Sequence, residues 1–427
     1  MSKVADRGHL FHYRADHFLK IRAFHMPINR RAFVAGVATA AVAPPFAAHA
    51  TPVPVQDTLP SDRFDPWIEV DLEALRYNVG VLSRLAGGKP ILAVIKNNAY
   101  GLGATIVARA LDAMPEIVGF AVVKTEAALE LADAGLRKPV LLMALFGESD
   151  GAELARRGVH FALCTDDGPE RVLAASRAAG RPVAAHVYLD TGMSRMGVPY
   201  HRAMPFLRRV AETDISIRGT FMGFTEEPEF DREQLRRFLE LAEQARAQGI
   251  DLGALHAASS AGIYHFPESH LDMVRPGISI YGAYPSNAGE ERGIAELRPA
   301  LRLKARVVRV EQLRVGDSVS YGRQYVADRP TWIATIPAGH TDGVPRQAVN
   351  GARVLINGKT YPAIGAVSAS HTIIEFGDEP GARIGDVATL IGPDDPAIHP
   401  NALADASGSS VYDILMHLNP TLPKVLS

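Results

Sequence analysis

The chain has 427 residues, of which 47% are hydrophobic and 22% are charged. This length is enough for two domains with separate cores. The composition, with 37 Gly and 29 Pro, excludes a disordered, collagen-like or coiled-coil protein. The formal net charge of -2 gives no indication of nucleic-acid binding. The single cysteine, Cys164, excludes an intramolecular disulfide and a cysteine-rich zinc site.

The first fifty residues have the composition of a targeting segment. They hold seven Lys and Arg residues against two Asp residues. The pair Arg30-Arg31 precedes an Ala-rich apolar run over 34–43, which is followed by a small-residue cleavage pattern over 48–50. Paired arginines before such a run resemble a twin-arginine export signal. The run is too short to span a bilayer as an anchor.

We therefore expect residues 1–50 to be a twin-arginine-type signal peptide and residues 51–66 to be a linker. Met26 is a second candidate start, because the export signal is complete without the residues before it. The mature protein is then expected in the periplasm, without a membrane span.

Between about residues 72 and 290, short apolar runs alternate with amphipathic stretches. The runs predict strands at Ile91–Ile95, Val118–Val123, Val140–Leu145, Phe161–Cys164, His186–Leu189, Gly219–Phe224, Ala254–Ala257 and Met273–Tyr281. The amphipathic stretches predict helices at Ala104–Met114, Glu126–Ala134, Glu153–Arg157, Glu170–Ala179 and Arg232–Gln248. Apolar strands separated by helices are typical of a parallel sheet covered by helices. Eight such strands predict a closed (β/α)8 barrel.

The predicted fold is α/β, with a TIM-like (β/α)8 barrel over 67–293 followed by a C-terminal, mostly β domain over 294–427. The second domain is indicated by β-rich runs at Leu301–Val310, Trp332–Ile336 and Val387–Ile391. An earlier run, Trp67–Val70, precedes the first helix, which Asp71 is expected to cap. This run could join the β domain in space.

A barrel of this kind places its active groups on the loops at the carboxyl ends of its strands. Lys96 ends the first predicted barrel strand, in the string Ile91-Leu-Ala-Val-Ile-Lys96-Asn-Asn-Ala-Tyr100-Gly-Leu-Gly103. Burial lowers the pKa of a lysine there and makes its amine available for Schiff-base chemistry. The Gly-containing turn that follows brings backbone N–H groups toward an anion. Taken alone, such a lysine could also extend from the barrel mouth into solvent.

The Lys96 string closely resembles the cofactor-lysine segment of the alanine racemases, which are barrel-type pyridoxal-phosphate enzymes. Further segments resemble the same family in order and spacing, at Leu189–Gly197, His256–Ser260, Met273–Gly282 and Val319–Gly322. Each segment alone is a weak to moderate match. Five in order, over about residues 67–424, identify the chain as a member of this family.

The resemblance implies that Lys96 holds pyridoxal 5'-phosphate covalently and acts as one acid/base. It also implies that Tyr321, reaching over from a partner subunit, acts on the opposite face of the cofactor in the shared active sites of a homodimer. Racemisation removes a proton from one face of Cα and returns a proton to the other. Two acid/base groups on opposite faces of Cα can therefore carry out these two proton transfers.

The cofactor phosphate is implied to be bound by Tyr100, Ser260 and the backbone amides of Gly277 and Ile278. Arg275 is implied to face the ring nitrogen of the cofactor. Because arginine keeps its proton, this nitrogen would stay largely unprotonated, which limits side reactions.

The substrate implied by the resemblance is a free amino acid, bound by Arg195 and by the backbone N–H of Ala369. The usual residues around Ala369 are replaced here by Ser368 and Ser370, but every residue other than proline keeps the N–H donor. No metal site is expected.

The chain departs from the family beside the cofactor ring. A histidine that the family places there is missing from the stretch 221–224, where Met222 or Phe224 is expected to supply apolar packing instead. Tyr188 stands where many relatives carry a modified lysine that steadies the substrate arginine.

The expected function is racemisation of a free amino acid, first of all of L-alanine to D-alanine. Pro420 or Asn419 falls where the family has a tyrosine that narrows the pocket, so a broad-specificity racemase for larger or basic amino acids is the close alternative. A non-catalytic relative that only binds the cofactor is an alternative of another class. The presence of both Lys96 and Tyr321 argues against it, because cofactor binding alone does not need the tyrosine.

Overall fold

A computed structural model describes residues 55–56 and 62–427 of the chain. The predicted signal peptide over 1–50 lies outside these described residues. No helix within the described part of the chain is both long and apolar enough to cross a membrane.

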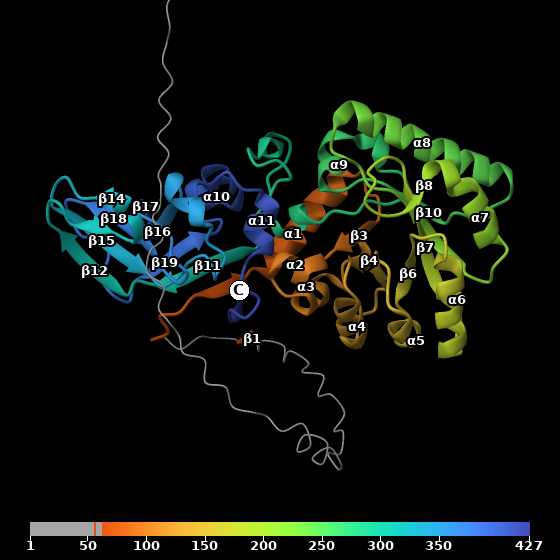
Figure 1. The fold of residues 1–427 in the computed structure, drawn as a ribbon, viewed down its shortest axis with the longest axis horizontal. Coiled ribbons are helices and arrows are strands. Elements are labelled where there is room, and N and C mark those ends of the chain that lie inside the picture. Colours follow the sequence, from red (N-terminus) through yellow and green to blue (C-terminus); the bar gives the residue numbers. More distant parts are fainter. Residues whose placement is uncertain (1–54, 57–61) are drawn as a thin grey trace, which may run out of the picture. The chain divides into compact units, whose positions relative to one another are not determined.

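Residues 91–276 form a parallel sheet that curls into a barrel (Figure 1). Its strands lie side by side in the order β10-β9-β7-β6-β5-β4-β3. They are β3 (Ile91–Val94), β4 (Ile117–Val122), β5 (Val140–Leu142), β6 (His160–Leu163), β7 (Ala184–Asp190), β9 (Ser216–Phe221) and β10 (Ala254–His256), with the short β8 (Val198–Pro199) paired to the end of β7. Both faces of the sheet are buried: in β3, Leu92 and Val94 belong to one apolar cluster while Ile91 and Ala93 belong to another. This explains why the strands read as continuous apolar runs.

The prediction of a regular eighth strand at Met273–Tyr281 is wrong. An extended segment over 272–276 takes its place and closes the barrel between β10 and β3. On one side, β3 donates N–H groups to the carbonyls of Val274 and Pro276, each at 2.9 Å. On the other side, the N–H of Arg275 donates to a carbonyl just beyond β10 at 2.8 Å. Because Pro276 has no N–H, the hydrogen-bond ladder cannot continue, and the chain then turns into a 3-10 helix.

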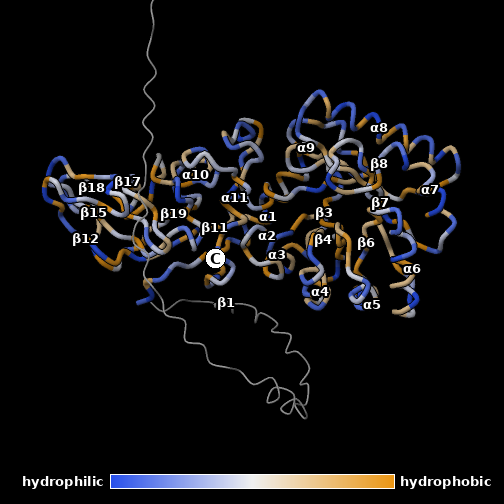
Figure 2. Tube along the Cα trace, in the orientation of Figure 1, coloured by the Kyte–Doolittle hydropathy of each residue, from blue (hydrophilic) through white to orange (hydrophobic). Residues whose placement is uncertain are grey.

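Helices lie outside the barrel strands; α1 precedes the first barrel strand and the others come after it in the chain. They are α1 (Leu72–Leu85), α2 (Lys96–Tyr100), α3 (Ala104–Leu111), α4 (Thr125–Asp133), α5 (Glu148–Arg156), α6 (Gly168–Ala179), α7 (Ala203–Ala211), α8 (Pro228–Ala247), α9 (Ser260–His265) and the 3-10 helix η3 (Ile278–Tyr281). Hydrophobic residues concentrate on the strands, whereas hydrophilic residues line the helices (Figure 2). The predicted cap of α1 is confirmed, since Asp71 Oδ1 accepts the N–H of Ala74 at 2.8 Å. Helix α7 was not predicted.

The C-terminal region is built on a ten-stranded sheet in the order β1-β20-β2-β11-β19-β16-β17-β18-β15-β12. Its strands are β1 (Val55–Gln56), β2 (Trp67–Val70), β11 (Leu301–Arg306), β12 (Arg309–Leu313), β15 (Thr331–Ile336), β16 (Arg353–Ile356), β17 (Lys359–Ile364), β18 (Thr372–Gly377), β19 (Val387–Ile391) and β20 (Lys424–Leu426). A separate pair is formed by β13 (Ser318–Val319) and β14 (Tyr325–Val326). The predicted α/β fold, a barrel followed by a mostly β domain, is thereby confirmed.

Two strands from before the barrel belong to this second sheet. The expectation for Trp67–Val70 is confirmed, because β2 pairs antiparallel with β11. The strand β1, within the stretch predicted as a linker, pairs with β20. The single run predicted at Leu301–Val310 is wrong, since it divides into β11 and β12, which lie far apart in the sheet order. The chain changes strand partners at this break. The backbone N–H of Val307 donates to the carbonyl of Asp386, just before β19, whereas the N–H of Val308 donates to the carbonyl of Thr335 in β15.

The C-terminal helices connect the β domain to the barrel mouth. Helix α10 (Pro400–Ser407) is followed by α11 (Val411–Met416), which packs against α2 (Figure 1). Gly101 lies at this contact with a φ of +92°, and a Cβ there would come within 2.8 Å of the Leu415 carbonyl and 2.9 Å of Leu418 Cβ. Only glycine combines this backbone angle with this close approach. The contact places α11 next to the Lys96 turn.

Candidate active site

Lys96 follows β3 and begins a left-handed turn. The four residues after it, 97–100, all have φ between +50° and +55°. Such conformations cost about 1–2 kcal/mol for each residue other than glycine, although asparagine tolerates them better. Asn98 holds the turn, because its carbonyl accepts the N–H of Gly103 at 2.9 Å and its side-chain oxygen accepts the N–H of Ala104 at 3.0 Å. Strain that the surrounding structure maintains is typical of functional sites.

The environment of Lys96 lowers the pKa of its amine from the ordinary value of 10.5. Desolvation by burial is the largest cause, and the positive charge of Arg195 adds to it. The carboxylate of Glu226 acts in the opposite direction. The amine therefore becomes neutral, and available as a nucleophile, at a lower pH than a solvent-exposed lysine. This agrees with the sequence-based expectation for Lys96.

A cluster of hydroxyl groups lies beside the Lys96 turn. Ser260 Oγ accepts the N–H groups of Gly277 at 3.1 Å and of Ser279 at 3.3 Å. A hydroxyl has two lone pairs and one proton, so the Ser260 proton remains free to be donated to an anion. A Cβ on Gly277 would collide with the Tyr100 hydroxyl. The structure thus brings together Tyr100, Ser260 and the Gly277–Ile278 segment.

A further buried hydroxyl in this region has no partner. Among the described residues, nothing forms a hydrogen bond with the buried hydroxyl of Ser259, whereas the Ser279 hydroxyl lies next to the Tyr264 hydroxyl. A buried donor left unpaired is costly, so this region is built to receive an acceptor. Ile278 is fully buried, and the Gly277 amide is already engaged by Ser260.

Arg275 lies on the closing segment of the barrel, next to β3. Its guanidinium is buried and donates to the carbonyls of His256 at 2.7 Å and Met222 at 2.6 Å. It also contacts His256 Nδ1 at 3.1 Å. Burial lowers the pKa of Arg275 to about 10, so the group stays charged at neutral pH.

The Arg275 contact sets the tautomer of the histidine pair behind it. Because arginine only donates, His256 Nδ1 must accept, and the proton lies on His256 Nε2. That nitrogen then donates to His186 Nδ1 at 3.1 Å. Burial lowers the pKa of both rings, that of His186 to about 3, so both histidines are neutral at neutral pH. Neutral rings fix the position of Arg275 without adding charge to the site.

Aromatic rings fill the barrel interior beside Arg275. Phe221 stacks on Tyr188 with ring centroids 4.3 Å apart, and the Arg275 guanidinium lies 5.2 Å from the Phe221 ring. The packing expected from Met222 or Phe224 is therefore supplied by Phe221, while these two residues face the outer core. The face of a strand alternates at each residue, which explains the difference.

Gly223 stands at the position of the missing histidine and has no side chain there. A Cβ there would meet Met193 Sδ at 3.4 Å and the Tyr188 hydroxyl at 3.7 Å. Tyr188, buried in the barrel, thus borders the same space from β7.

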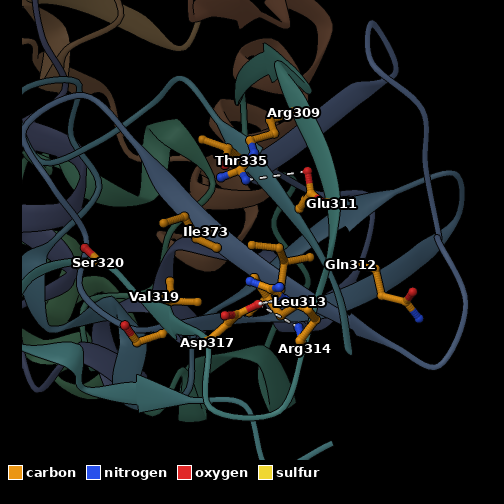
Figure 3. Close-up of a pocket in the computed structure, with 12 residues that line it drawn as sticks. Arg309, Glu311, Gln312, Leu313, Arg314, Asp317, Val319, Ser320, Thr335 and Ile373 are labelled. Atoms are coloured by element: carbon orange, nitrogen blue, oxygen red, sulfur yellow. Dashed lines mark hydrogen bonds and ion pairs between the residues drawn. The ribbon is translucent and has the colours of Figure 1, made fainter. Parts of the chain in front are cut away.

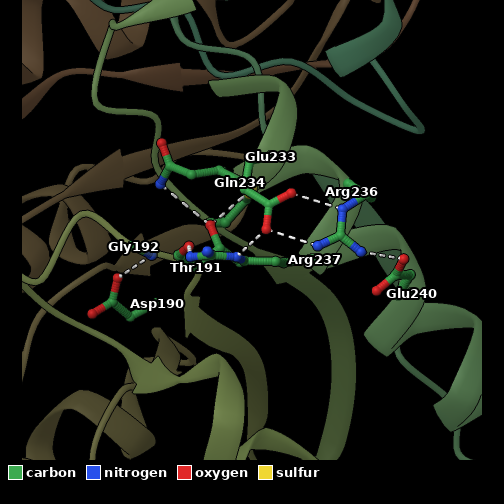
Figure 4. Close-up of polar contacts among 9 residues, drawn as sticks. Asp190, Thr191, Gly192, Glu233, Gln234, Arg236, Arg237 and Glu240 are labelled. Atoms are coloured by element: carbon green, nitrogen blue, oxygen red, sulfur yellow. Dashed lines mark hydrogen bonds and ion pairs between the residues drawn. The ribbon is translucent and has the colours of Figure 1, made fainter. Parts of the chain in front are cut away.

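Arg195 is exposed in the loop that follows β7. Asp190 shapes the beginning of this loop by accepting the N–H groups of Gly192 at 3.0 Å and Ser194 at 3.1 Å. Helix α8 holds the loop from the other side, where Arg237 donates to the Thr191 carbonyl at 2.9 Å (Figure 4). The Arg195 position is thus supported by its loop, without the modified lysine of the family.

Tyr321 and Ala369 lie in the β domain and are both exposed, the Tyr321 residue by 73%. The preceding Ser320 has a φ of +60°, and its hydroxyl donates to the Ala366 carbonyl at 2.8 Å. These contacts bring the Tyr321 turn close to the segment that holds Ala369. Within the described part of the chain, no hydrogen bond joins Tyr321 to Lys96.

A cavity of about 550 Å³ lies beside the Tyr321 turn. It is lined by strands of the β domain and includes Ser320 and the charged side chains of Arg309 and Arg314 (Figure 3). The cavity is therefore separate from the Lys96 cluster, although it adjoins one predicted catalytic residue.

The Lys96 cluster fits pyridoxal 5'-phosphate. It combines a desolvated amine, a buried guanidinium and buried hydroxyls that lie against Gly277, where a Cβ would collide with the Tyr100 hydroxyl. Hydroxyl groups and amides suit a phosphate, and a buried cation suits a ring nitrogen acceptor. Among the described residues, no three or more His, Cys, Asp and Glu side chains are grouped to hold a metal ion.

Sequence reasoning missed several groups of this site. The pairing of His256 with His186 depends on neighbouring strands, and no sequence spacing indicates it. Ser279 lies within the recognised segment 273–282 and its hydroxyl could have been noted there. Glu226 has no sequence signal, because its position depends on the conformation of a loop.

Two family models match the chain. One, described as "Alanine racemase, N-terminal domain", covers residues 70–285, and the other, "Alanine racemase, C-terminal domain", covers residues 300–426.

Several curated proteins and solved structures are similar over nearly their full length. The alanine racemase of Syntrophobacter fumaroxidans is 34% identical over 355 residues, covering 82% of this chain and 94% of that protein. The alanine racemase of Carboxydothermus hydrogenoformans is 34% identical over 367 residues, covering 84% and 98%. The crystal structure of alanine racemase from Streptomyces lavendulae superimposes with a TM-score of 0.80 at 29% identity, covering 87% of this chain and 98% of that one.

Proposed function

Because the chain belongs to the alanine racemase family, we propose that it interconverts the L and D forms of alanine with pyridoxal 5'-phosphate as its cofactor. The observation that carries this proposal is the cluster of Lys96, Ser260 and Arg275 at the carboxyl ends of the barrel strands. The family is dependent on this cofactor, and the cluster supplies an amine, a phosphate site and a buried cation for it.

The bound cofactor supplies an electron-withdrawing ring that makes the proton on the substrate Cα acidic. Lys96 Nζ exchanges a proton with Cα on one face, and its lowered pKa makes the neutral, proton-accepting form available. Tyr321 Oη of the partner subunit exchanges a proton on the other face. Arg195 and the Ala369 N–H bind the substrate carboxylate.

Arg275 directs the chemistry toward racemisation. Its guanidinium is held by backbone carbonyls and by a neutral histidine, and the residue keeps its protons at neutral pH. It would therefore donate a hydrogen bond to the ring nitrogen of the bound cofactor without giving up its proton. Tyr100 and Ser260 hold the phosphate through hydroxyl donors.

The proposed enzyme works as a homodimer. Support comes from the exposure of Tyr321 and from its position in the β domain, where no hydrogen bond joins it to Lys96 among the described residues. A second copy that brings its β domain to the barrel mouth would complete each site. Closed twofold symmetry would then complete both sites at once.

We place the mature enzyme in the periplasm, exported through the paired arginines of its N-terminal segment. The test is fractionation of cells that express the full chain. The wild type is expected in the periplasmic fraction, whereas the variant Arg30→Lys/Arg31→Lys is expected to stay in the cytoplasm. Equal periplasmic yield from both would contradict export by this route.

Relaxed specificity is a second candidate. It is supported by Gly223, which has no side chain where the family has a histidine, and by Pro420 and Asn419, which stand where the family has a narrowing ring. A broad-specificity enzyme would racemise larger amino acids at rates comparable with alanine.

A chiral product assay, combined with visible absorbance, tests the proposed function. Wild-type protein with cofactor is expected to show a visible absorption band and to racemise alanine in both directions. Lys96→Ala is expected to lose both the band and the activity. Tyr321→Phe is expected to keep the band and to lose activity in at least one direction. A protein that binds the cofactor but racemises no amino acid would instead be a non-catalytic relative.

A further inference from the structure

We propose that Thr341 is a positioning residue for substrate binding: its hydroxyl holds the backbone at Ala369, so that the free N–H of Ala369 stays directed at the substrate carboxylate. This inference rests on the racemase function proposed above and on the role given there to the Ala369 N–H. It adds a residue of the β domain that sets the affinity for the substrate and acts on it only through Ala369.

Ala369 lies in a tight turn at the end of the connection between β17 and β18. Ser368 closes this turn, because its N–H donates to the His371 carbonyl at 2.9 Å and its Oγ accepts the His371 N–H at 3.0 Å. The two residues between them, Ala369 and Ser370, are both exposed. The turn is thus defined by its own hydrogen bonds and presents Ala369 at the surface of the domain.

The Ala369 N–H points away from the segment that packs against this turn. On the other side of the same peptide bond, the Ser368 carbonyl accepts the N–H of His340 at 3.0 Å. In a planar trans peptide the C=O and N–H groups point in opposite directions, so the Ala369 N–H is directed away from His340. Within residues 62–427, no acceptor forms a hydrogen bond with it. The donor is therefore available to a ligand.

Thr341 holds the next peptide of the turn. The Ala369 carbonyl accepts two hydrogen bonds from this one residue, from its backbone N–H at 3.0 Å and from its Oγ1 at 2.8 Å. Both lone pairs of the carbonyl are thereby used. The peptide before Ala369 is held by His340 and the peptide after it is held by Thr341. Because both planes are fixed, the backbone at Ala369 has little freedom to turn its N–H in another direction.

Gly339 allows the two segments to come this close. A Cβ there would lie 2.4 Å from the carbonyl oxygens of both Ser368 and Ala369. The Gly339 N–H donates to Asp342 Oδ2 at 2.9 Å, which closes the turn that carries Thr341. Since neither feature involves the threonine hydroxyl, a variant without this hydroxyl is expected to keep the backbone of both turns.

The connection between β17 and β18 also supports the Tyr321 turn, but through a different contact. The Ser320 hydroxyl donates to the carbonyl of Ala366, three residues before Ala369. Thr341 binds only the later part of the connection. Removal of the Thr341 hydroxyl should therefore loosen the donor for the substrate carboxylate and leave the support of Tyr321 in place. Substrate affinity and the rate of proton transfer can thus be separated by experiment.

The test measures kcat and KM for L-alanine with the holoenzymes of Thr341→Val and Thr341→Ser. Valine has nearly the shape of threonine but lacks the hydroxyl, so one hydrogen bond is lost. We expect KM to rise about three- to tenfold in this variant, with kcat within about twofold of the wild type. Serine keeps the hydroxyl and is expected to keep KM near the wild-type value. The inhibition constant of propionate, which has the carboxylate without the amine, is expected to rise together with KM.

The matched control is Thr360→Val in β17. The Thr360 hydroxyl accepts a hydrogen bond from Arg353 Nε at 3.0 Å, so this variant also loses one threonine hydrogen bond in the β domain. It leaves the contacts of the Ala369 turn unchanged. We therefore expect the wild-type KM for alanine and the wild-type inhibition by propionate.

Three results would overturn the proposal while leaving the racemase function intact. One is an unchanged KM in Thr341→Val, even if its melting temperature falls, because Thr341 would then serve folding alone. Another is an equal rise of KM in Thr341→Val and Thr341→Ser, which would exclude the hydroxyl as the cause. The third is a fall in kcat as large as that of Tyr321→Phe, which would place the effect on the Tyr321 turn. A wild type that racemises no amino acid would instead refute the proposed function itself.

Discussion

His399 should make the folded protein sensitive to mild acid, and one substitution should remove part of that sensitivity. The ring is buried at the start of α10, where its Nδ1 accepts the N–H of Asn401 at 3.2 Å. Burial is the largest cause that lowers its pKa from 6.5 to about 4, and the charge of Arg292 adds to it. Below pH 6.5 the unfolded chain binds a proton that the folded chain refuses, so the free energy of unfolding falls as the pH falls.

The size of this effect follows from the two pKa values of His399. Between pH 7 and pH 5 it amounts to about 2 kcal/mol, since each pKa unit is worth about 1.4 kcal/mol. The variant His399→Asn keeps an acceptor at the helix start but has no proton to bind. Urea unfolding of both proteins, at pH 7 and pH 5, gives the difference in their free energies of unfolding.

We expect the wild type to lose about 2 kcal/mol more than His399→Asn on acidification. His160 and His186 also have lowered pKa values, of about 4 and about 3, so both proteins will still lose stability in acid. Parallel loss in the two proteins would refute the reasoning, because His399 would then be protonated in the folded chain.

Other substitutions follow from close approaches in the site. Gly101→Ala is expected to lower the melting temperature well beyond Gly135→Ala, because both glycines have positive φ but only the first would bring its Cβ within 2.8 Å of a carbonyl in α11. Gly277→Ala is expected to weaken cofactor binding without unfolding the apoprotein, as measured by equilibrium dialysis and circular dichroism; unchanged affinity would contradict the phosphate site. Phe221→Ala is expected to cost about 3 kcal/mol or more in urea unfolding, and a near-neutral result would contradict its place in the stack. Cofactor loading onto the apoprotein is expected to accelerate with pH and to level off below 10.5, because the pKa of Lys96 is lowered; a rate still rising above that pH would contradict the desolvated amine.

Most barrel strands could be predicted from the sequence because a parallel strand is buried on both faces and appears as a short apolar run. The run Met273–Tyr281 has the same appearance but forms an irregular segment, since Pro276 removes a donor from the ladder. The run Leu301–Val310 was predicted as one strand because nothing in its composition indicates that the chain changes its strand partners near Val307. Hydrophobicity reports burial, whereas hydrogen-bond partners decide where a strand ends.

The site could be predicted only where its residues occur in recognisable strings. Lys96, Ser260 and Arg275 follow or close barrel strands, as expected, and their roles stay predictions. The packing role was assigned to Met222 or Phe224, and not to Phe221, because the sequence does not show which residue of the stretch 221–224 faces the interior. Glu226 could not be predicted at all, since its positive φ accompanies a hydrogen bond from its N–H to Asp231 at the start of α8.

The central claim is that each active site combines Lys96 of one chain with Tyr321 of another. Mixing Lys96→Ala and Tyr321→Phe proteins under conditions that exchange subunits tests it directly. If the claim is correct, heterodimers contain one intact site, and random exchange restores alanine racemisation to about one quarter of the wild-type rate. If both residues act within one chain, every site in the mixture lacks one of them, and activity would stay at the level of the separate variants.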